Sequence, residues 1–166
     1  IIESIDWTED GWPKLADEKN EFAEDAEGSA QYATLRDFSN PIMWAKWEAG
    51  LDGADLWTIT AVDRSYQLSA EFELTEGAKA GLYLFYNENA YKGLQDTAQH
   101  FFVRIKNEKN VATIEKSLDG ENWTVVESNV DVSSYHHNNH GGFFALRPAL
   151  MISEGVTVKN FSYQVL

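Results

Sequence analysis

The chain has 166 residues and no cysteine, which fits a single domain without disulfides and excludes thiolate metal sites. Its 27 acidic and 13 basic residues give a formal net charge of −14, which argues against nucleic acid or anionic membranes as partners. A neutral ligand such as a glycan remains compatible with this charge, and no apolar run approaches the roughly 20 residues of a membrane span.

Residues 1–34 are acidic and irregular, and the run from Ala16 to Gln31 has the composition of a solvated linker. The chain begins at Ile1 without an initiator Met or a recognisable signal peptide. We therefore expect a mature product or a domain of a longer protein, and the compartment stays open. Residues 35–166 change character and have the pattern of successive β-strands, so we place the folded domain there.

Four segments carry the strand pattern most clearly. Tyr66–Leu74 alternates apolar and polar residues over nine positions, which predicts a strand with one buried and one exposed face. Ala80–Tyr86 is continuously apolar, as expected of a central strand covered on both faces. Phe101–Lys106 and Gly142–Arg147 alternate again.

Turn signals join these segments into one architecture. The pair Asp119-Gly120 lies between two strand-like runs and predicts a hairpin. In the last predicted strand, 156–165, the apolar residues change phase, which indicates a β-bulge near Asn160. Short strands at close spacing, with no convincing helix, predict an all-β antiparallel sandwich.

Two predicted strands pair an aromatic residue with an arginine on one face. Phe102 and Arg104 are two residues apart, and Phe143 and Arg147 are four apart, so each pair would share a face in an extended strand. Aromatic rings beside charged or amide groups suit sugars, which present apolar CH faces and hydroxyls. The alternative is that the rings belong to a second packed layer and the arginines form structural ion pairs.

Tryptophan and histidine are the other residues with alternative interpretations. Trp44 and Trp47 are either an exposed platform or part of the core, whereas Trp123, after the predicted hairpin turn, is expected to be structural. His136 and His140 would approach each other on a helix and suggest zinc, but the flanking Asn and Gly residues favour a polar loop that lines a pocket. Most acidic residues are interpreted as solvated surface charge.

Beyond these patterns, most of residues 60–166 resemble the C-terminal β-sandwich of glycoside hydrolase family 43 β-xylosidases. The opening segment 5–13 is also similar to the stretch by which such enzymes leave their catalytic propeller. The segments that carry the resemblance are Asp63–Tyr66, Ala80–Leu94, Arg104–Lys106, Ser117–Trp123, Tyr135–Asn138, Gly141–Ala149 and Val158–Tyr163.

The resemblance implies a concanavalin A-like sandwich of the carbohydrate-binding module family 91 type. In that family the module packs against a five-bladed β-propeller, helps to close its active-site pocket, and in some members binds xylan. The catalytic acid and base belong to the propeller, so no catalytic residue carries over to this chain. The loops 87–94 and 135–142 are the matched positions expected to close a pocket or touch sugar.

These observations predict a non-catalytic accessory module of a xylan- or arabinoxylan-degrading glycoside hydrolase. Its expected partners are xylan or xylo-oligosaccharide and a β-propeller glycosidase domain. No cofactor is expected, although oxygen-rich loops near Asp37 and Asn160 offer hard ligands that would suit a structural calcium ion. The residues predicted to bind sugar are Tyr86, Asn87, Tyr91, Phe102, Arg104, His136, His137, Phe143 and Arg147.

Two alternatives stay open at this point. In the first, the domain is a purely structural buttress that binds no glycan, and Trp7, Trp12 and the two loops form an apolar patch covered by protein. In the second, the chain is itself a concanavalin-like hydrolase or lyase, because fold does not determine function. His137, Tyr91 and Arg147 would then supply the reactive set.

Overall fold

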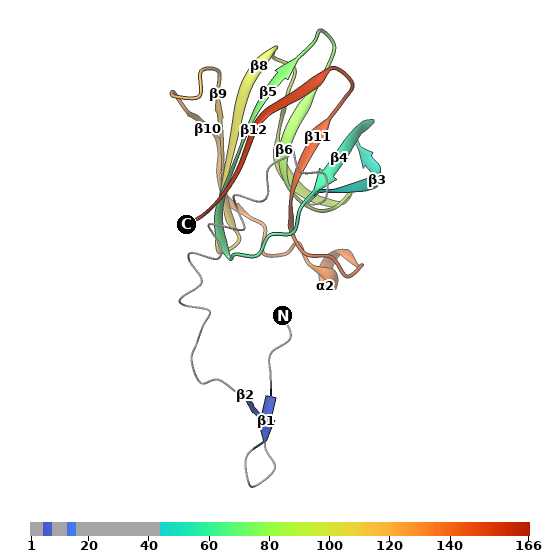
Figure 1. Cartoon of the computed structure of the whole chain (residues 1–166), viewed down its shortest axis with the longest axis vertical. Helices are drawn as coiled ribbons and strands as arrows, with labels where there is room; N and C mark the ends of the chain where they lie inside the picture. The colour runs from blue at the N-terminus through green and yellow to red at the C-terminus, as the bar shows by residue number, and fades with distance from the viewer. Residues whose placement is uncertain (1–4, 8–12, 16–43) are drawn as a thin grey trace.

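The computed structural model describes residues 5–7, 13–15 and 44–166. Residues 44–166 form two antiparallel five-stranded sheets that pack face to face, which confirms the predicted all-β sandwich (Figure 1). A separate two-stranded sheet pairs β1 (Ile5–Trp7) with β2 (Pro13–Leu15). The predicted domain boundary at residues 34 and 35 lies outside the described residues.

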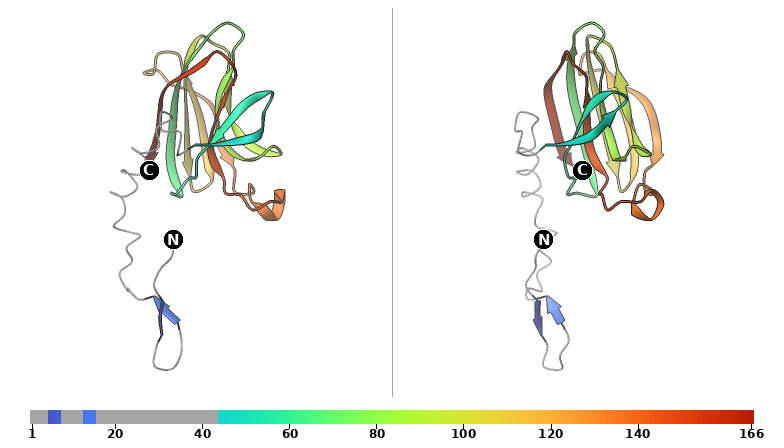
Figure 2. Two further views of the ribbon diagram at one scale, coloured as in Figure 1. Left: turned by 45° about the vertical axis from the view of Figure 1, so that its right-hand side comes forward. Right: turned by 90° about the vertical axis from the view of Figure 1, so that its right-hand side faces the viewer.

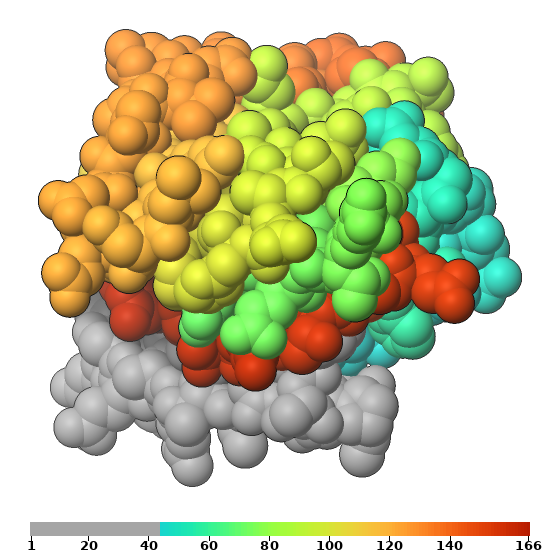
Figure 3. Space-filling model, turned by 90° about the horizontal axis from the view of Figure 1, so that it is seen from above, coloured from blue at the N-terminus to red at the C-terminus, as the bar shows by residue number. Residues whose placement is uncertain are grey.

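The first sheet, named here the β5 sheet, has the order β10-β9-β8-β5-β12, and the second, the β6 sheet, has the order β3-β4-β11-β6-β7. Seen from above, β9 and β10 lie on the opposite side of the molecule from β3 and β4 (Figure 3). The strands of the β5 sheet are β5 (Ser65–Leu74), β8 (His100–Glu108), β9 (Val111–Ser117), β10 (Thr124–Asp131) and β12 (Val156–Val165). Those of the β6 sheet are β3 (Ala45–Leu51), β4 (Ala54–Thr58), β6 (Ala80–Asn87), β7 (Ala90–Asp96) and β11 (Arg147–Ile152).

The β5 sheet has one buried face and one solvent-exposed face, as predicted from the alternation of apolar and polar residues. Along β5 every second residue is buried, and Leu68 and Phe72 are fully inaccessible. Along β8 the same holds for Val103 and Ile105, and Phe101 stacks on Phe72 with ring centroids 5.0 Å apart. These side chains form the main core with residues from the facing β6 sheet.

The β6 sheet is buried on both faces in its central strand, which confirms the prediction from the apolar run. All eight residues of β6 are buried. Leu82 and Leu84 point into the main core, whereas Tyr83 and Phe85 belong to a second cluster on the outer face of this curved sheet (Figure 2). The buried residues of the second cluster are Leu51, Ala54, Leu56, Tyr83, Phe85, Ala149 and Met151.

Register shifts occur at the edges of both sheets. The β12–β5 pairing shifts between Val158 and Asn160, which confirms the predicted bulge. The pairings of the other three edge strands, β10, β3 and β7, also contain a shift. The predicted hairpin at Asp119-Gly120 is confirmed as the β9–β10 connection.

One predicted strand is wrong. Residues 142–146 are not extended, and β11 begins only at Arg147. Gly141 and Gly142 have φ values of +65° and +69°, a left-handed conformation that interrupts any strand through them. Upstream, His137–His140 form a single helical turn, α2, where the sequence predicted a loop. Phe143 and Arg147 therefore do not share a strand face.

No helix in the described part of the chain has the length and apolarity needed to cross a bilayer.

Three buried tyrosines are expected to make the fold sensitive to alkali. Burial raises the pKa of Tyr66 to about 12, and it raises the pKa values of Tyr83 and Tyr163 as well. Unfolded tyrosines titrate near pH 10, so deprotonation above that pH favours the unfolded chain. The stabilisation is complete below about pH 10 and is lost as the pH rises towards about 12, with Tyr66 alone contributing about 2–3 kcal/mol.

Denaturant unfolding across this pH range, with ultraviolet titration of the seven tyrosines, measures the effect. We expect a group of tyrosines that ionises only as the protein unfolds. Titration of all seven near pH 10 in a folded chain would contradict the prediction.

Candidate functional site

A half-buried cation among aromatic rings lies at the start of β11. The guanidinium carbon of Arg147 is 4.8 Å from the ring centroid of Trp47, 5.1 Å from that of Phe144 and 5.6 Å from that of Phe85. These four residues are called the Arg147 cluster below. Arg147 Nη2 donates a 2.9 Å hydrogen bond to the Tyr86 carbonyl, and its buried Nε has no hydrogen-bond partner among the described residues. The cluster thus holds a cation against ring faces that attract it.

The electrostatics of the Arg147 cluster are set by burial. Desolvation lowers the pKa of Arg147, while Tyr86 and Glu88 oppose the shift. Glu88, in the β6–β7 turn, also accepts a 2.7 Å hydrogen bond from Trp47 Nε1. This bond fixes the indole over Phe85, with their ring centroids 5.3 Å apart in an edge-to-face arrangement.

The loop that carries α2, residues 132–146, is anchored to the end of β6 and is called the α2 loop below. The Tyr86 hydroxyl donates to the Gly141 carbonyl over 2.7 Å, and Asn87 Nδ2 donates to the His140 carbonyl over 3.0 Å. His136 caps the helical turn, because its Nδ1 accepts a bond from the Asn138 amide. Tyr86 and Asn87 are buried and therefore position the loop instead of facing solvent.

Among the aromatic rings of the α2 loop, Phe143 is far more exposed than Phe144, which is 43% exposed. Phe143 is 95% exposed, and its ring stacks on His137 with centroids 5.6 Å apart and planes inclined by 23°. The next residue, Phe144, is part of the Arg147 cluster and also packs against Trp47. Phe143 is thus an exposed side chain on an anchored backbone.

Removing the Tyr86 hydroxyl is expected to loosen the α2 loop. Tyr86→Phe keeps the buried ring but leaves the Gly141 carbonyl without its 2.7 Å bond. A lost buried hydrogen bond costs about 1 kcal/mol, so we expect a loss of that size in the free energy of unfolding. Amide exchange in residues 137–142 should accelerate more than exchange in β5. Tyr83→Phe is the matched control, since that hydroxyl makes only a 3.4 Å bond to Gln95; equal acceleration in both variants would contradict the prediction.

The structure separates the predicted sugar-binding residues into two groups. One group lies at the α2 loop and the adjoining β6 and β7, whereas Phe102 and Arg104 lie on the outer face of the β5 sheet. Arg104 Nε donates a 2.6 Å bond to Glu115, and its guanidinium carbon lies 4.0 Å from the Trp123 ring centroid. Arg104 therefore has the structural ion pair that was the alternative interpretation. The first group comprises Tyr86, Asn87, Tyr91, His136, His137, Phe143 and Arg147.

Sequence reasoning missed three members of the site's surroundings. For Trp47 the sequence allows either an exposed platform or a core position, and the structure places it in the Arg147 cluster. Trp44, which had the same two alternatives, is buried and packs edge-on against Phe161. Phe144 lies inside a segment predicted as a strand, and nothing in the sequence singles out Glu88. For the predicted buttress patch, the structure describes only the backbone of Trp7, and Trp12 lies outside the described residues.

The candidate metal ligands that the structure describes, His136, His140 and Asn160, do not form part of a metal-binding group. No group of three His, Asp or Glu side chains in residues 5–7, 13–15 and 44–166 could hold a metal ion. His136 uses Nδ1 as a cap, and the Asn160 amide donates to the Glu71 carboxylate. Asp37, the other calcium candidate, is not among the described residues.

Two carboxylates with little exposure, Glu115 in β9 and Asp96 in β7, lie in ion pairs. Glu115 contacts Arg104 and Lys106, and the hydrogen bond from Arg104 is the main cause that lowers the pKa of Glu115. Asp96 pairs with Lys116. A glycosidase acid needs a raised pKa, so Glu115 is unsuited to that role.

Comparison with known proteins identifies the fold but matches no sequence family. No protein-family model matches the chain, and no curated protein matches it significantly. Among solved structures, the GH43 protein BlXynB from Bacillus licheniformis superposes with a TM-score of 0.61 at 16% identity, covering 99% of this chain and 46% of that one. The xylan beta-1,4-xylosidase from Bacillus halodurans gives 0.61 at 10% identity, covering 98% and 46%.

A third structure, an engineered GH43 glycoside hydrolase with endo-xylanase and exo-arabinofuranosidase activity, gives a TM-score of 0.54 at 11% identity and covers 100% of this chain and 49% of that one. The chain thus spans about half the length of these structures. The fold implied by the sequence resemblance is confirmed, and the likeness at these identities concerns the fold.

Proposed function

We propose that this chain is a non-catalytic accessory module of a glycoside hydrolase that acts on xylan-type glycans, and that it completes the sugar-binding pocket of a catalytic partner domain. The observation that carries the proposal is Phe143, which is 95% exposed on an anchored loop. A ring fixed in this way can stack on a pyranose without the entropic cost of ordering a mobile loop.

The fold likeness supports the choice of enzyme class. Three structures similar to this chain are described as GH43 proteins or a xylan xylosidase, and the chain covers 46–49% of each. Their remaining length leaves room for a second domain. Following the sequence resemblance, we take the partner to be a β-propeller glycosidase domain that carries the acid and base.

The geometry favours pocket completion over an autonomous glycan groove. Tyr86 and Asn87 are used internally, and Phe102 and Arg104 lie on the other sheet. This leaves Phe143 and the adjoining His137 as the predicted residues most open to a partner. A single stacking ring contributes about 1 kcal/mol, too little for measurable affinity alone but useful beside the subsites of a partner.

Calorimetric titration and an activity assay together test the proposal. We expect the isolated chain to give little heat with xylohexaose or cellohexaose, and we expect a β-propeller xylosidase domain to hydrolyse xylobiose faster when this chain is bound to it. Saturable heat with xylohexaose but not with cellohexaose would instead establish an autonomous xylan-binding module. If the rate of xylobiose hydrolysis by the partner domain were the same with and without this chain, only the structural buttress role would remain.

A further inference from the structure

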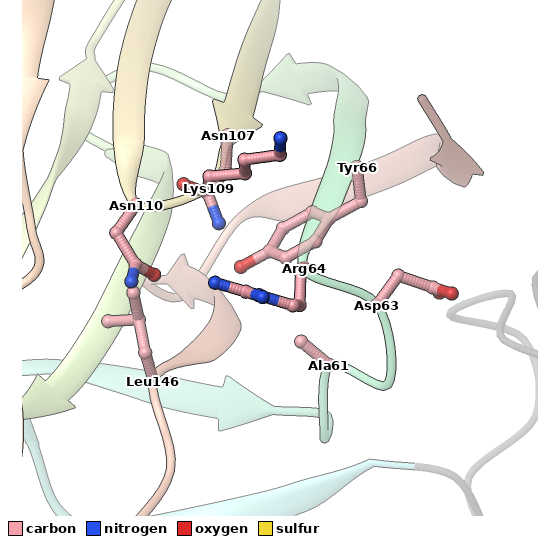
Figure 4. Close-up of a pocket in the computed structure, with 8 residues that line it drawn as sticks. All are labelled: Ala61, Asp63, Arg64, Tyr66, Asn107, Lys109, Asn110 and Leu146. Atoms are coloured by element: carbon pink, nitrogen blue, oxygen red, sulfur yellow. The ribbon is translucent and has the colours of Figure 1, made fainter. Parts of the chain in front are cut away.

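A small polar cavity lies at the end of the sandwich that also carries the α2 loop. Its volume is about 180 Å³, and it is lined by the β4–β5 connection, the start of β5, the β8–β9 turn and Leu146 (Figure 4). A cavity of roughly 150 Å³ holds benzene, so this one accepts a single six-membered ring.

The walls of the cavity are fixed by bonds that leave the Arg64 guanidinium, the Tyr66 hydroxyl and the Asn107 side chain unused. The Lys109 amide donates to the Arg64 carbonyl over 3.1 Å, which ties the β8–β9 turn to the chain before β5. The Tyr163 hydroxyl donates to the Asp63 carboxylate over 2.9 Å, and its ring stacks on Tyr66 with centroids 5.0 Å apart. The backbone and the Tyr163–Tyr66 stack therefore hold the cavity in shape.

Two deeply buried polar groups in the cavity lack partners. Tyr66 is 1% exposed and Asn107 is 3% exposed. The Asn107 side chain lies close enough to the Tyr66 hydroxyl to oppose the rise that burial causes in the pKa of Tyr66. Neither the Tyr66 hydroxyl nor Asn107 Oδ1 forms a hydrogen bond of ordinary geometry with another described residue. Buried polar atoms are almost always satisfied by protein, water or a ligand. Because burial raises the pKa of Tyr66 to about 12, its hydroxyl stays protonated at neutral pH and is available as a donor.

Cationic side chains also line the cavity. The Arg64 guanidinium and the Lys109 amine form no ion pair within the described part of the chain. The Arg64 guanidinium points towards the Tyr66 hydroxyl and the Asn107 amide, while the Asp63 carboxylate points away from them (Figure 4). The Lys109 amine points away from the Arg64 guanidinium (Figure 4), so Arg64 is the cation that faces the Tyr66 hydroxyl in a chain with a net charge of −14.

The donors and acceptors specify the chemistry of the missing occupant. A guanidinium fork beside a phenol donor suits a carboxylate. Asn107 Oδ1 requires a donor, which a bare carboxylate lacks but a hydroxyl supplies. We propose that this cavity binds a ring-sized sugar carboxylate, a uronic acid, with Arg64 on the carboxylate and Asn107 on a ring hydroxyl. The site is separate from Phe143, so it stands or falls independently of the proposed function.

Titration of the full chain with D-glucuronate tests the proposal, with D-glucose and acetate as the matched probes that lack the carboxylate or the ring. We expect saturable binding of glucuronate and at least about tenfold weaker binding of both controls, because hydrogen bonds to charged groups are the stronger ones. Absence of saturable glucuronate binding, or equal affinity for glucose, would overturn the proposal.

Variants assign any binding to this cavity. Arg64→Met should weaken glucuronate binding at least about tenfold, whereas Lys159→Met, which removes one charge from an exposed ion pair with Glu73, should leave it unchanged. Tyr66→Phe keeps the ring stack and removes an unpartnered hydroxyl, so its melting temperature should be unchanged or higher while affinity falls. Unchanged affinity in Arg64→Met and Tyr66→Phe would exclude the cavity as the site.

Discussion

Replacement of Phe143 by alanine is expected to lower kcat/KM of the partnered glycosidase by about fivefold, the factor that corresponds to about 1 kcal/mol, while leaving the fold intact. The side chain is 95% exposed and its one ring contact is His137, so truncation removes little buried surface. The melting temperature should therefore match that of the unmodified chain. Hydrolysis of xylobiose by a β-propeller xylosidase domain bound to the variant measures the loss.

The control for this experiment is Leu118→Ala. Leu118 is 63% exposed and lies in the β9–β10 connection, away from the α2 loop. Its substitution by alanine therefore also removes an exposed apolar side chain. It should leave kcat/KM unchanged. Equal effects of the two substitutions, or no effect of Phe143→Ala, would remove the central support for pocket completion.

Substitution of Gly93 by alanine should cost about 3 kcal/mol or more in the free energy of unfolding. A Cβ at this position in β7 would lie 2.2 Å from the Leu82 carbonyl oxygen and 2.6 Å from Cδ1 of Tyr83. The first contact is with backbone of the central strand, so no side-chain rotation relieves it. The clash is relieved only if β7 moves away from β6, and this movement would disturb the packing of Tyr91 against the second cluster.

Gly53→Ala provides the comparison for Gly93→Ala. Gly53 has a φ of +75° but nothing within 4 Å of the added methyl group, so only the backbone conformation is penalised, by about 1–2 kcal/mol. Denaturant unfolding of both variants separates the two effects. If Gly93→Ala were no more costly than Gly53→Ala, β7 would have to lie farther from β6 than described.

Alternation along single strands was sufficient to predict much of the fold. The burial of β5 and β8 follows a period of two, and the apolar run of β6 correctly indicated cover on both faces. These features depend on neighbouring residues only, so they are readable locally. The bulge near Asn160 was likewise predictable from a change of phase.

The candidate site was less predictable because it depends on contacts between distant segments. Periodicity assigns Phe102 and Arg104 to one face of a strand, but it does not say which sheet that strand joins. The hydrogen bond from Trp47 to Glu88 joins residues 41 positions apart in the sequence, so no local sequence pattern predicts it. The segment before Arg147 alternates like a strand, yet two left-handed glycines and the anchoring of the α2 loop by Tyr86 override that pattern.

The register shifts at the sheet margins restrict how this domain can associate. Each described edge strand, β10, β12, β3 and β7, has a register shift in its pairing, which interrupts the regular row of amides and carbonyls at that point. Side-by-side addition of a foreign strand, a common route to aggregation, is thereby disfavoured. A partner seated on the α2 loop, as proposed above, would meet side chains instead of an exposed strand backbone.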